Sequence, residues 1–451
     1  MSAATTDKSP SSTDYRIGLG GWANAWKIAA AFGCLGLAGA GAGYVADAKR
    51  FAFSYLFAFV FVLTIGLGSM MFVLIQHLTS AGWSVTVRRT AEFLMSGMPM
   101  LAVLFVPVLL VSGHLFPWMH MDSGHGHEAA LARTVHTPEV PAQSAVHAES
   151  TNSAEAEQTL IEEHEEAHLV SLKRPYLNTP FFLGRVAFYF LVWTLIALRL
   201  FGLSTRQDST KDPSLTVSAQ RMAPLAMIVT ALTMTFAGFD WLMSLDPTWY
   251  STIFGVWIFA GAIVCTHALI TLITLGLRRS GHLGNAVTVE HFHDLGKLSF
   301  GFLVFWAYIG FSQFFLIWYA SIPEETTFYH NRWGDGPWKA VSLLILFAHF
   351  VFPFLFMLSR NVKRRPGVLA IGVLTVVLMH VVEVYWIVMP NYVPSEGMQR
   401  GDVLAVSWVD LACLVGVAGA YFAWVFRQMT RHALIPVGDP RLPRSMAFEN
   451  A

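Results

Sequence analysis

Ten long apolar runs, separated by mostly short polar connectors, dominate this sequence of 451 residues. Apolar residues make up 55% of the chain and charged residues only 13%, whereas soluble domains carry roughly a quarter charged residues. About 20 apolar residues cross the hydrocarbon core of a bilayer as a helix. The sequence therefore predicts an all-α integral membrane protein of about ten transmembrane helices, at residues 27–46, 51–76, 93–115, 180–203, 222–245, 250–277, 298–320, 337–359, 367–389 and 403–426.

Lys and Arg are distributed unequally over the connectors, which predicts the orientation of the chain. One side receives 18 of them and the opposite side 7, and the basic side of a membrane protein is the cytoplasmic one. We expect a multi-pass protein of the bacterial inner membrane with both termini in the cytoplasm. Its predicted parts are a cytoplasmic tail (1–25), spans 1–3 (26–115), a periplasmic loop (116–179), spans 4–5 (180–245), spans 6–10 (246–426) and a second cytoplasmic tail (427–451).

The loop 116–179 contains a zinc-protease pattern, H-E-x-x-H, at His164 to His168. In such enzymes two histidines one helical turn apart bind zinc and the glutamate activates water. Glu162, Glu163 and Glu166 surround this pattern, and the acidic flanks favour a solvated loop over a protease or a divalent-metal site. The loop carries seven histidines in all, at His120, His125, His127, His136, His147, His164 and His168.

Ionisable and amide side chains inside the apolar runs are the candidate functional residues. Such groups are costly in lipid and usually face a cavity, a bundle interior or one another. His380 and Glu383 lie three residues apart, on one helix face. Internal hydrogen bonds between helices are the alternative role for these groups. Ordered by depth from cytoplasm to periplasm, with water between them, Asp294, His267, His349 with His380, Glu383 and then Gln313 predict a path for protons, and Asp240 is a further candidate for it.

Other polar features of the spans favour simpler explanations. Arg185 and Arg199 lie near opposite ends of one run, where snorkelling to the lipid headgroups accounts for them. His349 and His380 lie at similar depth, yet no Gly-rich helix pattern typical of a bis-histidine haem accompanies them. The three cysteines form no CxxC or CxxCH motif, so we expect no iron–sulfur cluster and no covalently bound haem in this chain. No nucleotide-binding or nucleophile motif is present either, and the balanced charge gives no indication of nucleic-acid binding.

Several stretches of the sequence resemble one family. They are FDWLMSLDPTWY at 239–250, HDLGKL at 293–298, parts of 306–326, HFVFP at 349–353 and HVVE at 380–383. With these stretches, most of residues 20–430 is similar to the ActF membrane subunit of bacterial alternative complex III, a member of the NrfD-like (polysulfide-reductase) integral membrane family. The segment between 239 and 326 is the most specific part of the resemblance.

The resemblance implies two four-helix bundles, spans 2–5 and 6–9, flanked by spans 1 and 10. It implies a non-catalytic subunit of a respiratory quinol:cytochrome c or oxidase-linked oxidoreductase, which scaffolds the membrane module and relays protons. Quinone or menaquinone would be the substrate of the complex. The c-type haems and iron–sulfur clusters would lie in partner subunits: an ActC-like sister subunit, a multi-haem cytochrome c, an iron–sulfur protein and, in some complexes, a terminal oxidase, with lipids around them.

Three other functions remain open at the level of sequence. The first is a quinol-binding NrfD-like anchor of another periplasmic oxidoreductase, with a pocket near Asp240. The second is a secondary or metal transporter that uses the His-rich loop as a metal funnel. The third is the metalloprotease based on His164, Glu165 and His168.

Overall fold

The computed structural model describes residues 15–18, 20–121, 168–395 and 398–450. The described chain is helical without strands, and ten of its helical segments are long and apolar enough to cross a membrane. This confirms the predicted all-α membrane fold. The spans run over Gly21–Ala46, Ala48–Leu78, Val85–Leu110, Thr179–Thr210, Pro213–Leu245, Phe254–Arg279, Val289–Ala320, Trp338–Leu358, Pro366–Asn391 and Trp408–Arg431.

The labelled helices follow the spans, and some spans contain several. Spans 1 and 2 are α1 (Gly21–Ala46) and α2 (Ala48–Leu78), and span 3 is broken into α3 (Val85–Met95), α4 (Met98–Leu104) and α5 (Val106–Leu110). Span 8 comprises α15 (Trp338–Leu344), η2 (Ile345–Val351) and α16 (Phe352–Leu358). The other spans are α10 (Thr179–Thr210), α11 (Pro213–Trp241) with η1 (Met243–Leu245), α12 (Phe254–Arg279), α13 (Val289–Ala320), α18 (Pro366–Val388) with η3 (Met389–Asn391), and α19 (Trp408–Arg431).

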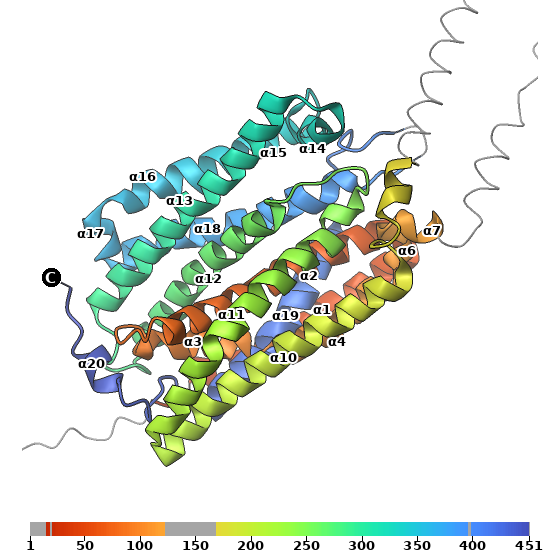
Figure 1. The fold of residues 1–451 in the computed structure, drawn as a ribbon. Helices are drawn as coiled ribbons and strands as arrows, with labels where there is room; N and C mark the ends of the chain where they lie inside the picture. The colour runs from red at the N-terminus through yellow and green to blue at the C-terminus, as the bar shows by residue number, and fades with distance from the viewer. Residues whose placement is uncertain (1–14, 19, 122–167, 396–397, 451) are drawn as a thin grey trace, which may run out of the picture.

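The long helices lie side by side, with short helices at both ends of the slab (Figure 1). At one end lie α6 (Ser112–Leu115), α7 (Trp118–Met121) and α14 (Pro323–Trp333); α17 (Arg360–Lys363) and α20 (Leu442–Met446) lie at the other. Helices α2, α3, α10 and α11 form one bundle, and α12, α13, η2–α16 and α18 form a second. The two predicted four-helix bundles are therefore confirmed, with α1 and α19 beside them.

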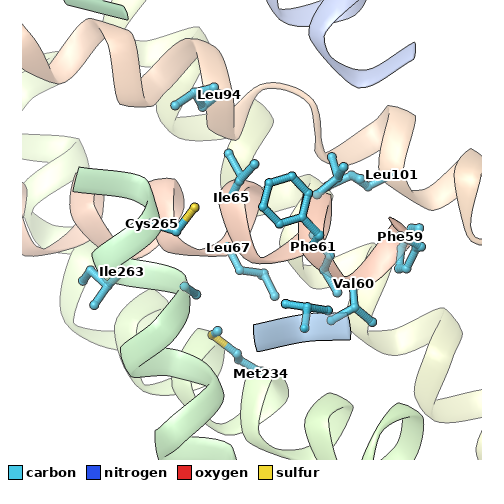
Figure 2. Packing of buried hydrophobic residues seen from close by; sticks show 14 of the residues in the cluster. Phe59, Val60, Phe61, Ile65, Leu67, Leu94, Leu101, Met234, Ile263 and Cys265 are labelled. Carbon is cyan, nitrogen blue, oxygen red and sulfur yellow. The ribbon is translucent and has the colours of Figure 1, made fainter. Parts of the chain in front are cut away.

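Helix α2 forms the centre of the protein, and nearly all of its side chains are buried. It packs against α3, α11, α12, α18 and α19. Figure 2 shows its side chains Phe61 and Ile65 between residues of the third span on one side and residues of α11 and α12 on the other. A helix that is apolar all round is stable in such a position because every face meets another helix.

The third span begins at Val85, so the predicted start at 93 is wrong. Its first turns carry Arg88, Arg89 and Glu92, all buried. Arg88 contacts Glu92 at 2.8 Å and Asp439 at 2.9 Å, and Arg89 contacts Glu92 at 3.0 Å. Hydropathy excluded these turns because it counts three charged residues there and cannot register that Glu92 and Asp439 neutralise the two arginines. The segment 427–451, expected to be a tail, supplies one of them, since α19 continues to Arg431 and the following residues pack back on α3.

The tenth span begins at Trp408 instead of the predicted 403. Ser407 precedes the helix and forms a capping box with Asp410. The Asp410 carboxylate also pairs with the guanidinium of Arg50 on α2, and its other oxygen accepts from Ser54 at 2.6 Å. Arg50, assigned to a connector from sequence, is thus a buried link between two helices.

Small residues bring α1 and α19 into backbone contact. A Cβ placed on Gly36 would lie 2.2 Å from the backbone nitrogen of Gly416, and one on Gly419 would lie 2.5 Å from that of Gly33. Close approach at small residues is a common way for membrane helices to gain dispersion contact.

Gly36→Val should therefore separate α1 from α19 and lower the melting temperature of the purified protein in mild detergent. The expected cost is at least about 1–3 kcal/mol, the range for overpacked sites. Gly41→Val on the same helix is the control, because a Cβ there meets nothing within 4 Å. Equal melting temperatures for the two variants would contradict this packing.

Candidate functional site

The polar centre of the second bundle is a cluster of His349, His380 and Glu383, with Thr64 and Trp306 beside it. Glu383 and His380 both project from α18, and the His380 Nδ1 lies 2.8 Å from the Glu383 Oε2. The other ring nitrogen of His380 lies 2.9 Å from the hydroxyl of Thr64 on α2. The indole N–H of Trp306 on α13 donates to the Glu383 Oε1 at 2.6 Å. All three titratable side chains of this His–Glu cluster are buried.

His349 completes the cluster from the eighth span. Its Nδ1 lies 3.8 Å from the Glu383 Oε2, and its ring centroid lies 4.3 Å from that of Trp306. Neither ring nitrogen has a hydrogen-bond partner among the described residues. The backbone around it, Ile345–Val351, is a π-helix, a distortion frequent at functional sites. The Glu383 carboxylate thus faces two imidazoles, one bonded to it and one close by.

A glycine on α12 makes room for this arrangement. A Cβ on Gly261 would lie 3.1 Å from the His380 Cε1 and 3.3 Å from the Glu383 Oε2. Helix α12 can therefore pack directly against the polar face of α18 only because this position carries no side chain.

The other residues of the predicted proton path lie in separate environments. The His267 ring stacks on Phe302 with 5.2 Å between centroids, and its Nδ1 contacts the Ile263 carbonyl at 2.7 Å. Asp294 contacts Lys297 at 2.5 Å, near the end of the bundle where α17 lies. The remaining member, Gln313, bonds to the hydroxyls of Ser251 and Tyr329, each at 3.1 Å.

Asp240 belongs to the first bundle and is paired with Arg185. The guanidinium of Arg185 on α10 donates to both carboxylate oxygens of Asp240 at 2.8 Å. Tyr189 also donates to Asp240, at 2.8 Å. Snorkelling is therefore the wrong explanation for Arg185, which turns inward to neutralise a buried acid. Arg199 on the same helix is exposed, as a snorkelling residue would be.

A large cavity adjoins the His–Glu cluster. Its volume is about 590 Å³, and residues of α12, α13, α14, η2 and α18 line it. Trp257, Trp306 and Trp386 form part of the wall, and Glu383 lies on it as its one acidic group. Cavities of roughly 300–1,000 Å³ with apolar walls and few polar groups are typical of small-molecule sites.

Arg332 of α14 anchors the outer end of the second bundle. It donates to the carbonyls of Trp386 at 3.1 Å and of Ile387 at 2.9 Å, which end helix α18, and its guanidinium lies over the Phe328 ring. Burial lowers the pKa of Arg332 to about 9, although Asp246 opposes the shift. The guanidinium is thus a cationic cap that fixes α14 over the cavity.

Metal and haem sites find little support in the described residues. These hold no group of three or more His, Cys, Asp or Glu side chains arranged for a metal ion. Both ring nitrogens of His380 are already engaged, so it is unsuited as an axial haem ligand. His164 lies outside the described residues, together with most of the loop, and His168 is exposed among the helical residues 168–173.

Comparison of the chain with protein-family profiles and with curated proteins found no match. The class of the protein therefore follows from its fold and side chains alone: a multi-pass, all-α membrane protein with a buried His–Glu cluster beside an apolar cavity.

Arg185→Leu should destabilise the protein by about 3–5 kcal/mol, because it leaves Asp240 buried and unpaired. The double variant Arg185→Leu/Asp240→Asn should recover most of the loss, since it removes both charges and keeps an oxygen for Tyr189. Thermal unfolding in mild detergent measures both. Arg199→Leu is the control on the same helix, with an expected change within about 0.5 kcal/mol. A double variant no more stable than the single one would contradict the pairing.

Proposed function

We propose that this chain is a membrane subunit of a respiratory quinol:cytochrome c or oxidase-linked oxidoreductase, and that it scaffolds the membrane module and relays protons through its second bundle. The observation that carries the proposal is the His349–His380–Glu383 cluster at mid-span. Ionisable groups at this depth are costly, and proton relays are one of the roles that account for them.

The contacts of the cluster suit short proton transfers. His380 bridges the Thr64 hydroxyl and the Glu383 carboxylate, so a proton on one ring nitrogen can pass to Glu383 while the other nitrogen accepts one. The carboxylate can pass the proton on to His349, whose ring nitrogens are free of hydrogen bonds within the described chain. A rotation of the Glu383 side chain or of the His349 side chain would close the 3.8 Å gap between them.

The rest of the proposed path requires water. His267 and Asp294 extend the path toward the end of the bundle that carries α17, and Gln313 extends it toward the end that carries α14. The described contacts do not join these groups to the cluster directly, so bridging waters would complete the path. Asp240 is held by Arg185 in the first bundle and is better explained as part of the scaffold.

Location and partners follow from the same proposal. The excess of Lys and Arg on one side favours cytoplasmic termini and a periplasmic loop 116–179 in a bacterial inner membrane. Electrons from quinol would pass to iron–sulfur clusters and c-type haems on periplasmic partner subunits, with an ActC-like sister subunit beside this chain. The outer face of α13, with Tyr308, Phe311 and Tyr319 exposed, offers surface for lipids.

Purification through this subunit in mild detergent tests the assignment. We expect multi-haem cytochrome c and iron–sulfur subunits to co-purify, with haem bands in the visible spectrum and quinol-oxidising activity. Mass spectrometry identifies the partners. A colourless protein that purifies alone would overturn the proposal and favour a transporter.

Glu383→Gln should lower turnover-coupled proton movement by about tenfold or more, because Gln has nearly the same shape, still accepts from the Trp306 N–H and cannot carry a proton. A pH indicator in proteoliposomes of the assembled complex measures protons moved per electron. Glu324→Gln, an exposed position on α14, is the matched control. Unchanged proton movement in a Glu383→Gln complex of normal melting temperature would remove Glu383 from the relay.

A further inference from the structure

The cavity beside Glu383 opens toward the membrane. Tyr308 and Phe311 of α13 line it and are 64% and 63% exposed, and Leu346 of η2 is 42% exposed. All three lie within membrane-spanning segments. Exposed side chains at that depth face hydrocarbon, so a molecule dissolved in the bilayer can enter without crossing water.

Three polar groups of the wall have unused hydrogen-bonding capacity. The indole N–H of Trp257 is buried and has no partner in the described chain. Each oxygen of Glu383 makes one hydrogen-bond contact, with Trp306 and with His380, and has lone pairs that can accept more. The hydroxyl of Tyr329 accepts from Gln313, which leaves its own proton to donate. Burial raises the pKa of Tyr329, so that proton is retained.

The composition of the wall distinguishes between two kinds of occupant. An acyl chain would fill the space and leave the Trp257 N–H unsatisfied, and a buried donor without a partner costs about 1–3 kcal/mol. A ring that carries oxygen atoms satisfies the donor and gains contact with the aromatic walls. The remaining wall is formed mainly by aromatic and aliphatic side chains, among them Trp306, Phe314, Trp333, Ile345 and Phe350.

We propose that this cavity binds the oxygenated ring of a lipid-soluble quinone or quinol. One ring oxygen accepts from the Trp257 N–H, a quinol hydroxyl donates to Glu383, and the isoprenoid tail leaves through the opening between α13 and η2. The choice of a quinone among ring-bearing lipids rests on the proposed function. The cavity, its opening and its unsatisfied donor are observed independently of that function. Glu383 then faces a ligand oxygen on one side and the His380 imidazole on the other.

A photoreactive azido-decylbenzoquinone tests the site in the full-length chain, purified with its partners and placed in nanodiscs. We expect saturable labelling of peptides of α13 and α14, displaced by decylbenzoquinone and not by oleic acid. Gly310→Leu, which places a side chain in the cavity 3.3 Å from the Trp257 Nε1, should reduce this labelling at least about tenfold. Gly301→Leu on the same helix, where a Cβ meets nothing within 4 Å, should leave it unchanged.

Trp257→Phe tests the hydrogen bond, because it removes the indole N–H and keeps a smaller aromatic ring in the wall. Since one N–H donor is lost, the affinity for decylbenzoquinone should fall about 2- to 10-fold, which is the net contribution of one hydrogen bond. The smaller ring leaves space at a buried site, so the ligand-free protein should melt somewhat below the wild type, and affinity is compared below both melting temperatures. Displacement by oleic acid as effective as by decylbenzoquinone, or labelling insensitive to both Gly310→Leu and Trp257→Phe, would overturn the proposal and assign the cavity to an acyl chain.

The two proposals fail separately. Co-purifying haem subunits with unlabelled α13 and α14 peptides would leave the respiratory assignment standing and remove the quinone site. Specific labelling of a chain that purifies without redox partners would keep the site and remove the respiratory assignment.

Discussion

A charge within the hydrocarbon core has no water to solvate it, and pairing inside the protein is what makes the charged residues of these spans tolerable. Each buried pair also connects separate parts of the chain. Arg185 and Asp240 connect α10 to α11, Arg50 and Asp410 connect α2 to α19, and Arg88 connects α3 to Asp439 near the C-terminus. Removing one partner of such a pair would leave a bare charge in an apolar surrounding. The order of the helices around α2 therefore depends on these contacts as well as on apolar packing.

Lipid and side chains are equally apolar, so shape governs how these helices associate. Glycines allow α1 and α19 to touch along their backbones, and Gly261 allows α12 to approach the His380–Glu383 face of α18. Glu383 also lies on the wall of a cavity of about 590 Å³, which residues of α12, α13, α14, η2 and α18 line. The same carboxylate thus contacts a buried imidazole and borders an apolar cavity.

These two surroundings of the Glu383 carboxylate link the two functional proposals. A carboxylate bonded to an imidazole can exchange a proton with it, and a carboxylate on a cavity wall can exchange one with a ligand hydroxyl. Glu383 has both surroundings, with the His380 ring at 2.8 Å and the cavity beside it. The π-helix at Ile345–Val351 contributes to both, since it carries His349 into the cluster and Leu346 to the cavity opening.

Hydropathy and residue spacing alone determined the ten spans and the shared helix face of His380 and Glu383, because both depend only on distances along the chain. The two-bundle arrangement came from the family resemblance, and the fold confirmed it.

Predictions from the sequence were wrong or incomplete where a side chain meets a partner from a distant part of the chain. They assigned Arg185 to the headgroups, placed Arg88 and Arg89 outside the third span, and ordered the proton-path residues by depth alone. Hydropathy along a single span does not reveal that Arg185 faces Asp240, or that Trp257 and Trp306 enclose a cavity with Glu383. Those relations arise only when helices far apart in the sequence pack together.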